Sequence, residues 1–315
     1  MKRALLAQIV TLVLLAATSC ATPVPAATPL APSATATHTP WPTDTPTSTP
    51  LPPTPTATVA ATPTETPAAP TEVVPGLYAV VNVVSDDVLN VRAQPGVAHR
   101  IVGTIPPYGM EVHVTGPGEE VAGALWVPIE YQDITGWVNS NYLARQVGSV
   151  DEEIAACAAQ IIMALKHEDL ETLASLVHPD KGVRFSPYTY VRAEDLVFSA
   201  DRISDFFADQ TIYTWGVFDG SGEPIEFTPR EYYDRFIYDA DFARPHVVGF
   251  NETIAMGNTI NNIAEEYPQA VTIEYHFEGF DPEFVGLDWR SLRLVLEKEE
   301  GACYLVGIVH DEWTI

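Results

Sequence analysis

Basic residues are scarce in this sequence, and the scarcity excludes two classes of partner. The chain of 315 residues has 16 Lys and Arg against 42 Asp and Glu, which gives a formal net charge of −26. Nucleic-acid binding needs a basic patch that neutralises phosphates, and the sequence has none. The same charge opposes electrostatic attachment to an anionic lipid surface, so a membrane would have to be reached through a covalent lipid.

The sequence also lacks the common catalytic motifs. It has no glycine-rich phosphate loop, no His-Glu-x-x-His zinc site and no Gly-x-Ser-x-Gly nucleophile elbow. Residues 219–223 place oxygen ligands around glycines, as calcium sites do, but they lack the EF-hand pattern and indicate a simple acidic turn. We therefore expect neither a metal nor a cofactor.

Cysteine is equally rare, and its positions indicate a structural role. Cys20, Cys157 and Cys303 are the only three in the chain. Cys157 falls on the apolar face of a predicted helix and Cys303 in a predicted strand, so neither has the surroundings of a nucleophile. An oxidising compartment would allow a disulfide between these two, and such a bridge would close a loop of nearly the whole C-terminal region.

The first 20 residues are organised like an export signal. Lys2 and Arg3 precede an apolar run over residues 4–17 that is too short for a comfortable membrane span, and small residues then lead into Cys20. This segment resembles a bacterial lipoprotein signal peptide. The resemblance implies lipidation of Cys20, anchoring to the cell membrane and an extracytoplasmic location. An ordinary secretory signal, which would give a secreted protein, and an uncleaved anchor are the alternatives.

Residues 21–75 are dominated by threonine and proline. They contain 16 Thr and 15 of the 27 Pro in the chain. Proline removes backbone donors and favours extended polyproline II conformations, and almost no residue here could contribute to a core. We expect a disordered linker that acts as a stalk between the membrane and the folded domains.

Residues 76–147 change to short β-branched and aromatic runs between Gly and Pro turns, which predicts a small all-β barrel. The predicted strands cover residues 78–84, 101–105, 111–115, 126–131 and 136–138. Several cues follow one another in order: LNVRAQPG from Leu89, IVG from Ile101, PYG from Pro107, then Trp126, and GWVNSNYL from Gly136. Together they resemble a bacterial SH3-like (SH3b) domain.

The physical roles of individual residues agree with this resemblance. Gly96 and Gly109 suit turns that need a positive φ. Trp126, Trp137 and Tyr142 would supply the bulk that a very small core needs.

The SH3b resemblance implies binding of a cell-wall glycan or a peptide, not catalysis. The residues that could line a groove are Arg92, Tyr108, Trp126, Asn141 and Tyr142. The competing interpretation makes each of them a core or turn residue, because aromatic side chains in small domains mostly fill cores.

Residues 148–315 predict an acidic α+β domain, with helices first and a curved antiparallel sheet last. Helices are predicted from residue 151 and over 170–177, 201–209 and 229–238, and alternating strands over 271–277, 291–297 and 304–310. This order resembles the nuclear-transport-factor-2-like cone; a cystatin-like or unnamed α+β arrangement is the alternative. Phrases such as residues 182–188 and 288–293 also resemble an uncharacterised module of extracytoplasmic bacterial proteins.

The acidic domain contains candidate polar sites. If it is an enzyme, His276, His310, Asp311 and Asp288 are the candidates, since a His–Asp pair can do acid–base work. His276 alternates away from its apolar neighbours, so it would be solvent-exposed or face a pocket. The candidates for ligand binding are Arg184, Tyr188 and Arg290.

These observations favour a surface-anchored extracytoplasmic binding protein, in which the SH3-like domain engages cell-wall or peptide ligands and the acidic domain has a ligand pocket. One alternative makes the acidic domain a hydrolase or isomerase that uses a His/Asp pair. That alternative requires His276 or His310 within hydrogen-bonding reach of a carboxylate inside a concave pocket. A second alternative is a non-catalytic scaffold.

Overall fold

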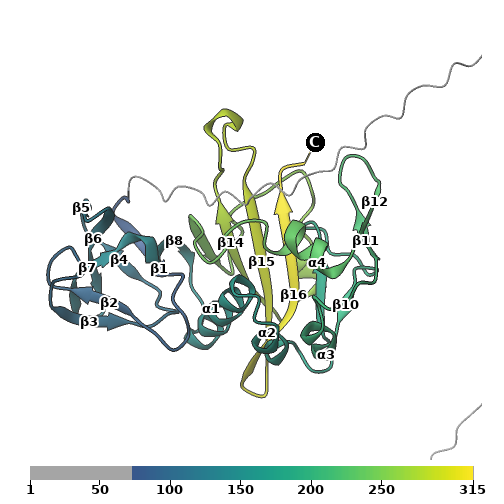
Figure 1. Ribbon diagram of the computed structural model, residues 1–315, viewed down its shortest axis with the longest axis horizontal. Helices are drawn as coiled ribbons and strands as arrows, with labels where there is room; N and C mark the ends of the chain where they lie inside the picture. Colours follow the sequence, from purple (N-terminus) through teal and green to yellow (C-terminus); the bar gives the residue numbers. More distant parts are fainter. Residues whose placement is uncertain (1–72, 315) are drawn as a thin grey trace, which may run out of the picture. The chain divides into compact units, whose positions relative to one another are not determined.

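The computed structural model describes residues 73–314 (Figure 1). The predicted signal peptide over residues 1–20, with its lipidation site Cys20, and nearly all of the predicted linker over residues 21–75 lie outside the described residues. Within residues 73–314, no helix is both long enough and apolar enough to cross a membrane.

The first folded domain consists of eight strands around one hydrophobic core. The strands follow one another in the hydrogen-bonded order β8-β1-β4-β6-β7-β2-β3, and β5 pairs with β6. Their bounds are β1 (Gly76–Val80), β2 (Leu89–Arg92), β3 (Ile101–Ile105), β4 (Val112–Val114), β5 (Glu119–Val121), β6 (Ala124–Tyr131), β7 (Ile134–Asn139) and β8 (Leu143–Gly148), with the 3₁₀ turn η1 (Ser140–Tyr142) before β8.

Two local predictions for this domain need correction. The strand predicted over residues 78–84 starts earlier and ends at Val80, because Asn82 takes a left-handed conformation with φ 56°. Gly96 has the expected positive φ of 112°, but Gly109 does not, and Glu111 takes the positive φ instead. Gly109 is required for a different reason: a Cβ there would lie 2.3 Å from the Ile105 side chain.

The three aromatic side chains predicted to fill this core have different environments. The buried cluster consists mainly of aliphatic side chains, with Tyr78 and Tyr131 as its aromatic members. Trp126 is only 5% exposed but lies outside that cluster, and Trp137 and Tyr142 are partly exposed. Trp126 is therefore buried as predicted, Tyr142 packs against the aliphatic cluster, and Trp137 is partly exposed outside it.

The second folded domain contains short helices and a sheet, and its elements are more numerous than the sequence predicted. They are α1 (Glu152–Lys166), α2 (Leu170–Leu176), β9 (Val183–Ser186), β10 (Val197–Phe198), α3 (Ala200–Ser204), β11 (Tyr213–Val217), β12 (Pro224–Phe227), α4 (Pro229–Tyr232), the π-helical turn η2 (Tyr233–Ile237), β13 (Val247–Phe250), α5 (Ile263–Glu266), β14 (Val271–Phe277), the 3₁₀ turn η3 (Pro282–Phe284), β15 (Arg290–Glu299) and β16 (Ala302–Glu312).

One predicted helix is shorter than expected, and another changes its helix type along its length. The helix predicted over residues 201–209 is the single turn α3 followed by turns. The helix predicted over residues 229–238 begins as expected, with Pro229 in its first turn and a capping box between Thr228 and Glu231, but it continues as the π-helical turn η2.

The sheet of this domain is mixed rather than antiparallel. Strands β13, β14, β15 and β16 pair antiparallel in sequence order, as the alternating pattern predicted for the last three. However, β9 pairs parallel with β16, and β13 pairs parallel with β8. The strands before β14 were not predicted, because each has five residues or fewer and shows little alternation.

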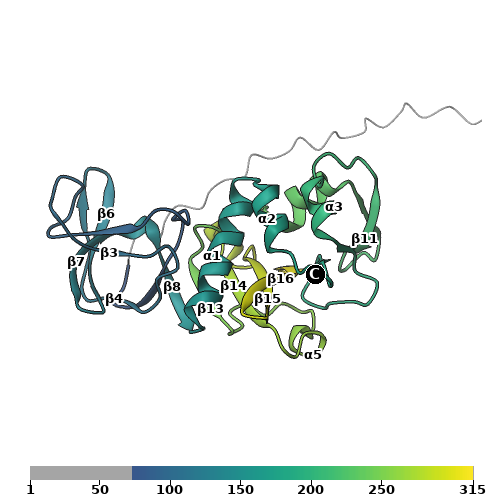
Figure 2. The same ribbon diagram turned by 90° about the horizontal axis from the view of Figure 1, so that it is seen from below.

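The strands β14–β16 are buried on both faces. On one face, Tyr275, Leu294 and Ile308 pack in the core that includes α1. On the other face, Val295 and Val309 pack with Ile263 of α5. Figure 2 shows α1 and α5 on opposite sides of these strands. This second cover has no counterpart in the sequence prediction, which expected one apolar face only.

Strand β8 is shared by the two domains. It pairs antiparallel with β1, through Tyr78 opposite Arg145, and parallel with β13, where Val247 is also opposite Arg145. The hydrogen-bonded sheet is therefore continuous from the first domain into the second.

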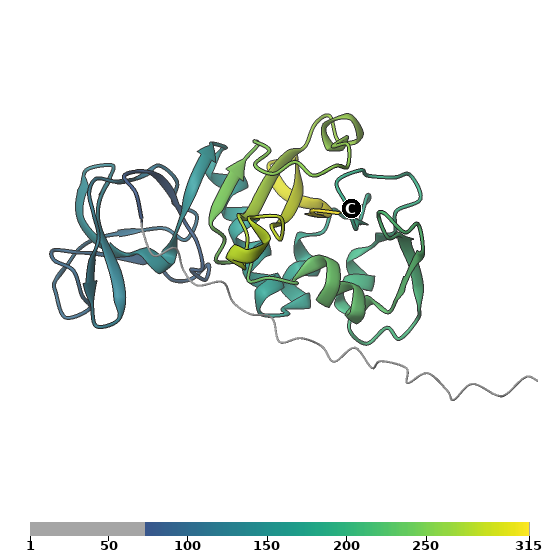
Figure 3. The ribbon, with the colours of Figure 1, turned by 90° about the horizontal axis from the view of Figure 1, so that it is seen from above.

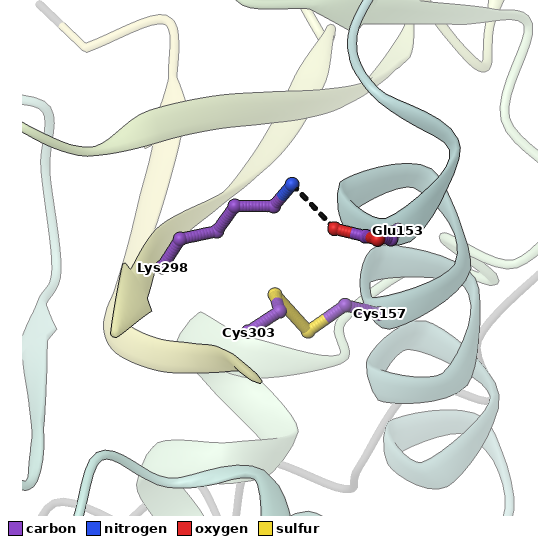
Figure 4. The surroundings of a disulfide bond; sticks show 4 residues. All are labelled: Glu153, Cys157, Lys298 and Cys303. Atoms are coloured by element: carbon purple, nitrogen blue, oxygen red, sulfur yellow. Dashed lines mark hydrogen bonds and ion pairs between the residues drawn. A yellow bond between two sulfur atoms is a disulfide. The ribbon is translucent and has the colours of Figure 1, made fainter. Parts of the chain in front are cut away.

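A disulfide joins the first helix of the second domain to its last strand (Figure 4). Cys157 of α1 and Cys303 of β16 are bonded across a sequence separation of 146 residues. Beside this bond, Lys298 of β15 donates to Glu153 and Asp151 at the start of α1. The covalent bond thus closes almost the entire second domain into one loop.

We expect the double substitution C157A/C303A to lower the free energy of unfolding by about 4–5 kcal/mol, because the bridge restricts a very long loop in the unfolded chain. Urea unfolding of both proteins at neutral pH measures the difference. The substitution K298Q is the matched control: it removes only exposed ion pairs at the same junction and should change stability little. Equal stability of the double variant and the unmodified protein would contradict a formed disulfide.

Candidate functional site

The first domain has a groove beside the connection between β1 and β2. Its cavity volume is about 310 Å³. Three of the residues predicted to bind a ligand, Arg92, Trp126 and Tyr142, contribute to its wall. The other lining residues are Asn82, Val83, Val84, Asp87, Val88, Leu89, Asn90, Val97 and Asn139.

The groove combines apolar surface with polar groups that can still bind. Trp126 and Tyr142 supply aromatic surface, and Val97 is 74% exposed. Arg92 donates to the carbonyl of His99 over 2.8 Å and pairs with no carboxylate of residues 73–314. Aromatic rings beside a guanidinium that lacks a carboxylate partner suit a ligand with an apolar part and an acceptor group.

The sequence missed the asparagine side chains of this groove, although one signal was present. Leu89 and Val91 point into the core, so the alternation along β2 turns Asn90 outward next to Arg92. Asn82 and Asn139 come from other segments, and only the fold brings them to the same wall.

The remaining groove candidates lie elsewhere. Tyr108 lines a separate, open hollow of about 560 Å³ together with Glu111, Glu130 and Tyr131. Asn141 belongs to the turn η1, where its backbone N–H donates to the Asn139 side chain. The structure therefore brings together three of the five sequence candidates.

In the second domain, His276 belongs to a buried polar cluster and is not exposed, contrary to prediction. Only 7% of the residue is exposed: the Trp289 ring lies 5.9 Å from the imidazole between centroids, and the segment leading to α5 contacts the neighbouring Glu274 on the same face. Its Nδ1 lies 2.9 Å from Ser291 Oγ, and that hydroxyl also donates to Glu274 over 2.6 Å. Burial lowers the pKa of His276 from its ordinary value, and this effect exceeds the opposing influence of Glu274.

Arg293 is the centre of this buried cluster. Its guanidinium donates to both carboxylate oxygens of Glu274, over 3.0 and 3.2 Å, and to Asp311 over 2.8 Å. It also donates to the Thr189 hydroxyl and to the Ala255 carbonyl, each over 2.8 Å. All five N–H groups of the side chain thus have partners, which is the condition for burying a charge at tolerable cost.

Both carboxylate oxygens of Glu274 also accept several hydrogen bonds. Besides Arg293 and Ser291, it accepts the backbone N–H groups of Ile254 and Ala255 over 3.0 and 3.1 Å. Burial alone would raise the pKa of Glu274, but the charge of Arg293 and these hydrogen bonds outweigh it, and the pKa is lowered. The carboxylate is therefore held in its charged form.

His310 lies in a different cluster, on the α1 side of the sheet. It is fully buried, and its Nε2 is 3.3 Å from Asp239. Arg290 donates to the same Asp239 oxygen over 2.9 Å and lies 3.3 Å from Glu312, which also pairs with Arg235. The charge of His310 and the two arginines outweigh burial, so the pKa of Asp239 is lowered.

A metal ion would fit the spacing of this cluster but not its charge pairing. Ligand atoms of Asp239, His310 and Glu312 lie within 4.8 Å of one another. Arg290 and Arg235 already neutralise both carboxylates. A cation would have to displace them, so we interpret the group as an ion-pair cluster.

The four catalytic candidates do not form one site. His276 and Asp311 lie on one face of the sheet and His310 on the other, because successive strand residues alternate between faces. Asp311 forms an ion pair with the buried Arg293. Asp288 accepts the backbone N–H groups of Phe280 and Asp281 and so shapes the loop between β14 and β15. The required histidine–carboxylate arrangement in a concave pocket is absent among these residues.

The three ligand-binding candidates of this domain are also separated. Arg290 forms an ion pair with Asp239. Arg184 donates to the carbonyls of Arg192 and Ala193, over 2.6 and 3.3 Å, and so supports the loop before β10. Only Tyr188 lines a pocket.

We expect R293M to lower the free energy of unfolding by about 3–5 kcal/mol, because it leaves Glu274 and Asp311 buried without their cation. Denaturant unfolding measures the loss. K181M, which breaks an exposed pair with Glu297, should cost no more than about 1 kcal/mol. Similar losses in the free energy of unfolding for R293M and K181M would show that the buried cluster stabilises the fold no more than an exposed ion pair does.

Stability should also fall as the pH is lowered from 7.5 to 5.5. Burial lowers the pKa of both His276 and His246 below the ordinary 6.5, so in this range the unfolded chain binds protons that the folded chain does not. Melting temperatures across this range measure the effect. H246N/H276N should show a flatter profile than the unmodified protein, and an equally steep profile would assign the loss to other groups.

Comparison with known proteins identifies the domain that carries the groove. No curated protein matches the chain. Residues 87–144 match the family model of the bacterial SH3 domain, which confirms the resemblance drawn from the motifs around Leu89, Trp126 and Gly136. The groove of Arg92, Trp126 and Tyr142 is thus built on a bacterial SH3 domain.

Proposed function

We propose that this protein is a surface-anchored extracytoplasmic binding protein whose SH3 domain binds cell-wall peptide or glycan through the groove at Arg92. The observation that carries the proposal is the groove itself, in which Arg92, Trp126 and Tyr142 meet on a domain of the bacterial SH3 family. Domains of this kind are binding modules, often related to the cell wall.

The chemistry of the groove supports a peptide-like or glycan-like ligand. Aromatic rings offer flat apolar surface, the asparagine side chains offer both donors and acceptors, and the guanidinium of Arg92 attracts a carboxylate or carbonyl.

Two features support a location outside the cytoplasm. The Cys157–Cys303 disulfide suits an oxidising compartment. The basic start, short apolar run and Cys20 suit a lipoprotein signal, and residues 21–75 would then act as the stalk. In this proposal the lipid on Cys20 holds the protein at the membrane and the SH3 domain reaches the wall.

The second domain would have a non-catalytic role in the same protein. His276 and His310 are both buried and line none of the pockets described above, which supports a non-catalytic role over the hydrolase or isomerase alternative. The packing of α1 against the sheet supports the proposed kinship with the nuclear-transport-factor-2-like cone. That kinship would suit a domain with a ligand pocket.

Co-sedimentation of the full chain with insoluble bacterial cell-wall sacculi tests the proposal. We expect R92Q to weaken binding about tenfold, the loss of one charge-assisted hydrogen bond, and Y142A to weaken it as well. R100Q and W137A are the matched controls, since neither residue lines the groove. Binding of R92Q equal to that of R100Q would reject the groove, and no binding of the unmodified chain would reject the ligand class.

A further inference from the structure

The second domain has a pocket that the proposed function does not use. It lies between the loop of residues 187–195 and the hairpin of β11 and β12, and its volume is about 230 Å³. Figure 3 shows the end of β16 beside the green segment that includes this hairpin. Tyr188, Tyr190, Arg192 and Phe218 are among the lining residues.

The loop that forms one wall is held rigidly by buried polar groups. The side chain of Asn262 accepts from the Val191 N–H over 2.7 Å and donates to the Val191 carbonyl over 2.9 Å. Asp195 accepts from the Arg192 N–H over 2.9 Å and from Ser186 over 2.6 Å. With Thr189 bonded to the buried Arg293, the loop backbone is fixed before any ligand arrives.

The two side chains on either side of Val191 have no partner of their own. Tyr190 is 45% exposed, and its ring and hydroxyl contact no other aromatic ring or hydrogen-bonding group of residues 73–314. Arg192 is partly buried and lines the pocket, and its guanidinium makes no hydrogen bond or ion pair within the same residues. An arginine without a carboxylate partner is notable in a domain where most basic side chains pair with carboxylates.

The two carboxylates that line the pocket, Asp195 and Asp219, accept hydrogen bonds from neutral groups of the protein. Asp195 is bonded to the loop, as above. Asp219 accepts from the Gly220 N–H over 3.1 Å and from the Thr314 hydroxyl. The hairpin wall is open at Gly222, where an added Cβ would meet nothing within 4 Å. Arg192 is thus the cationic side chain of the lining, and its guanidinium makes no hydrogen bond within residues 73–314.

We propose that this pocket binds a small aromatic carboxylate, with the carboxylate on Arg192 and the ring against Tyr190. A guanidinium binds a carboxylate through two parallel hydrogen bonds, and the three aromatic residues of the wall suit a flat ring in offset or edge contact. The small volume admits a single ring, and the nearby Asp219 disfavours a doubly charged phosphate group. The proposal is independent of the SH3 groove.

Ligand-observed NMR titration of the full chain with phenylacetate tests the proposal, and phenylacetamide serves as the uncharged probe. We expect phenylacetate to bind at millimolar concentration and the amide about tenfold more weakly, as for one charge-assisted contact. R192Q should abolish the preference for the acid, and Y190A should weaken both probes.

R244Q is the matched control, because Arg244 also lacks an ion pair within residues 73–314 but does not line the pocket. It should bind phenylacetate as the unmodified protein does. No binding of phenylacetate to the unmodified protein, or equal binding to R192Q and R244Q, would overturn the proposal. Because both substitutions affect partly exposed side chains, circular dichroism should show the same fold for each variant.

Discussion

The second domain depends on the complete pairing of one buried cation, Arg293. Its guanidinium connects Glu274 of β14 and Asp311 of β16 to Thr189 of the pocket loop and to the carbonyl of Ala255. An unpaired charge at this depth would cost several kcal/mol, so each of these segments must be in place together. The cluster therefore fixes the cover on the second face of the sheet, and through that cover the wall of the pocket.

The cover on this face of the sheet determines the environment of His276. A one-sided sheet would leave His276 facing solvent or a pocket, where it could act as an acid or base. Covered by the segment before α5, His276 instead becomes a buried hydrogen-bonding group beside Ser291. His310 is buried on the opposite face, where its Nε2 lies 3.3 Å from Asp239, so the sheet separates the two candidate histidines. Tyr190 and Arg192 remain accessible, on a loop that Asn262 holds in place.

In the SH3 domain, an aliphatic core rather than an ion-pair cluster supports the residues of the groove. Aliphatic side chains fill its interior, so Trp126 and Tyr142 can contribute their rings to the groove wall next to Arg92. Its last strand, β8, continues directly into the sheet of the second domain through β13. In both domains the side chains proposed to bind ligands take no part in the ion-pair clusters.

The sequence alone determined the features that depend on local pattern. The SH3 motifs, the antiparallel strands β14–β16, the start of α1 and the apolar setting of Cys157 and Cys303 follow from residue order, because turn chemistry and side-chain alternation act over a few residues. Only the tertiary structure decided the parallel pairings, the second cover of the sheet, the grouping of Asn82 with Asn139, and the partners of Arg293. These contacts join residues more than a hundred positions apart in sequence, as Arg293 and Thr189 or Arg184 and Gly307 are. No local pattern specifies them, since their energy arises only when burial removes water from both partners.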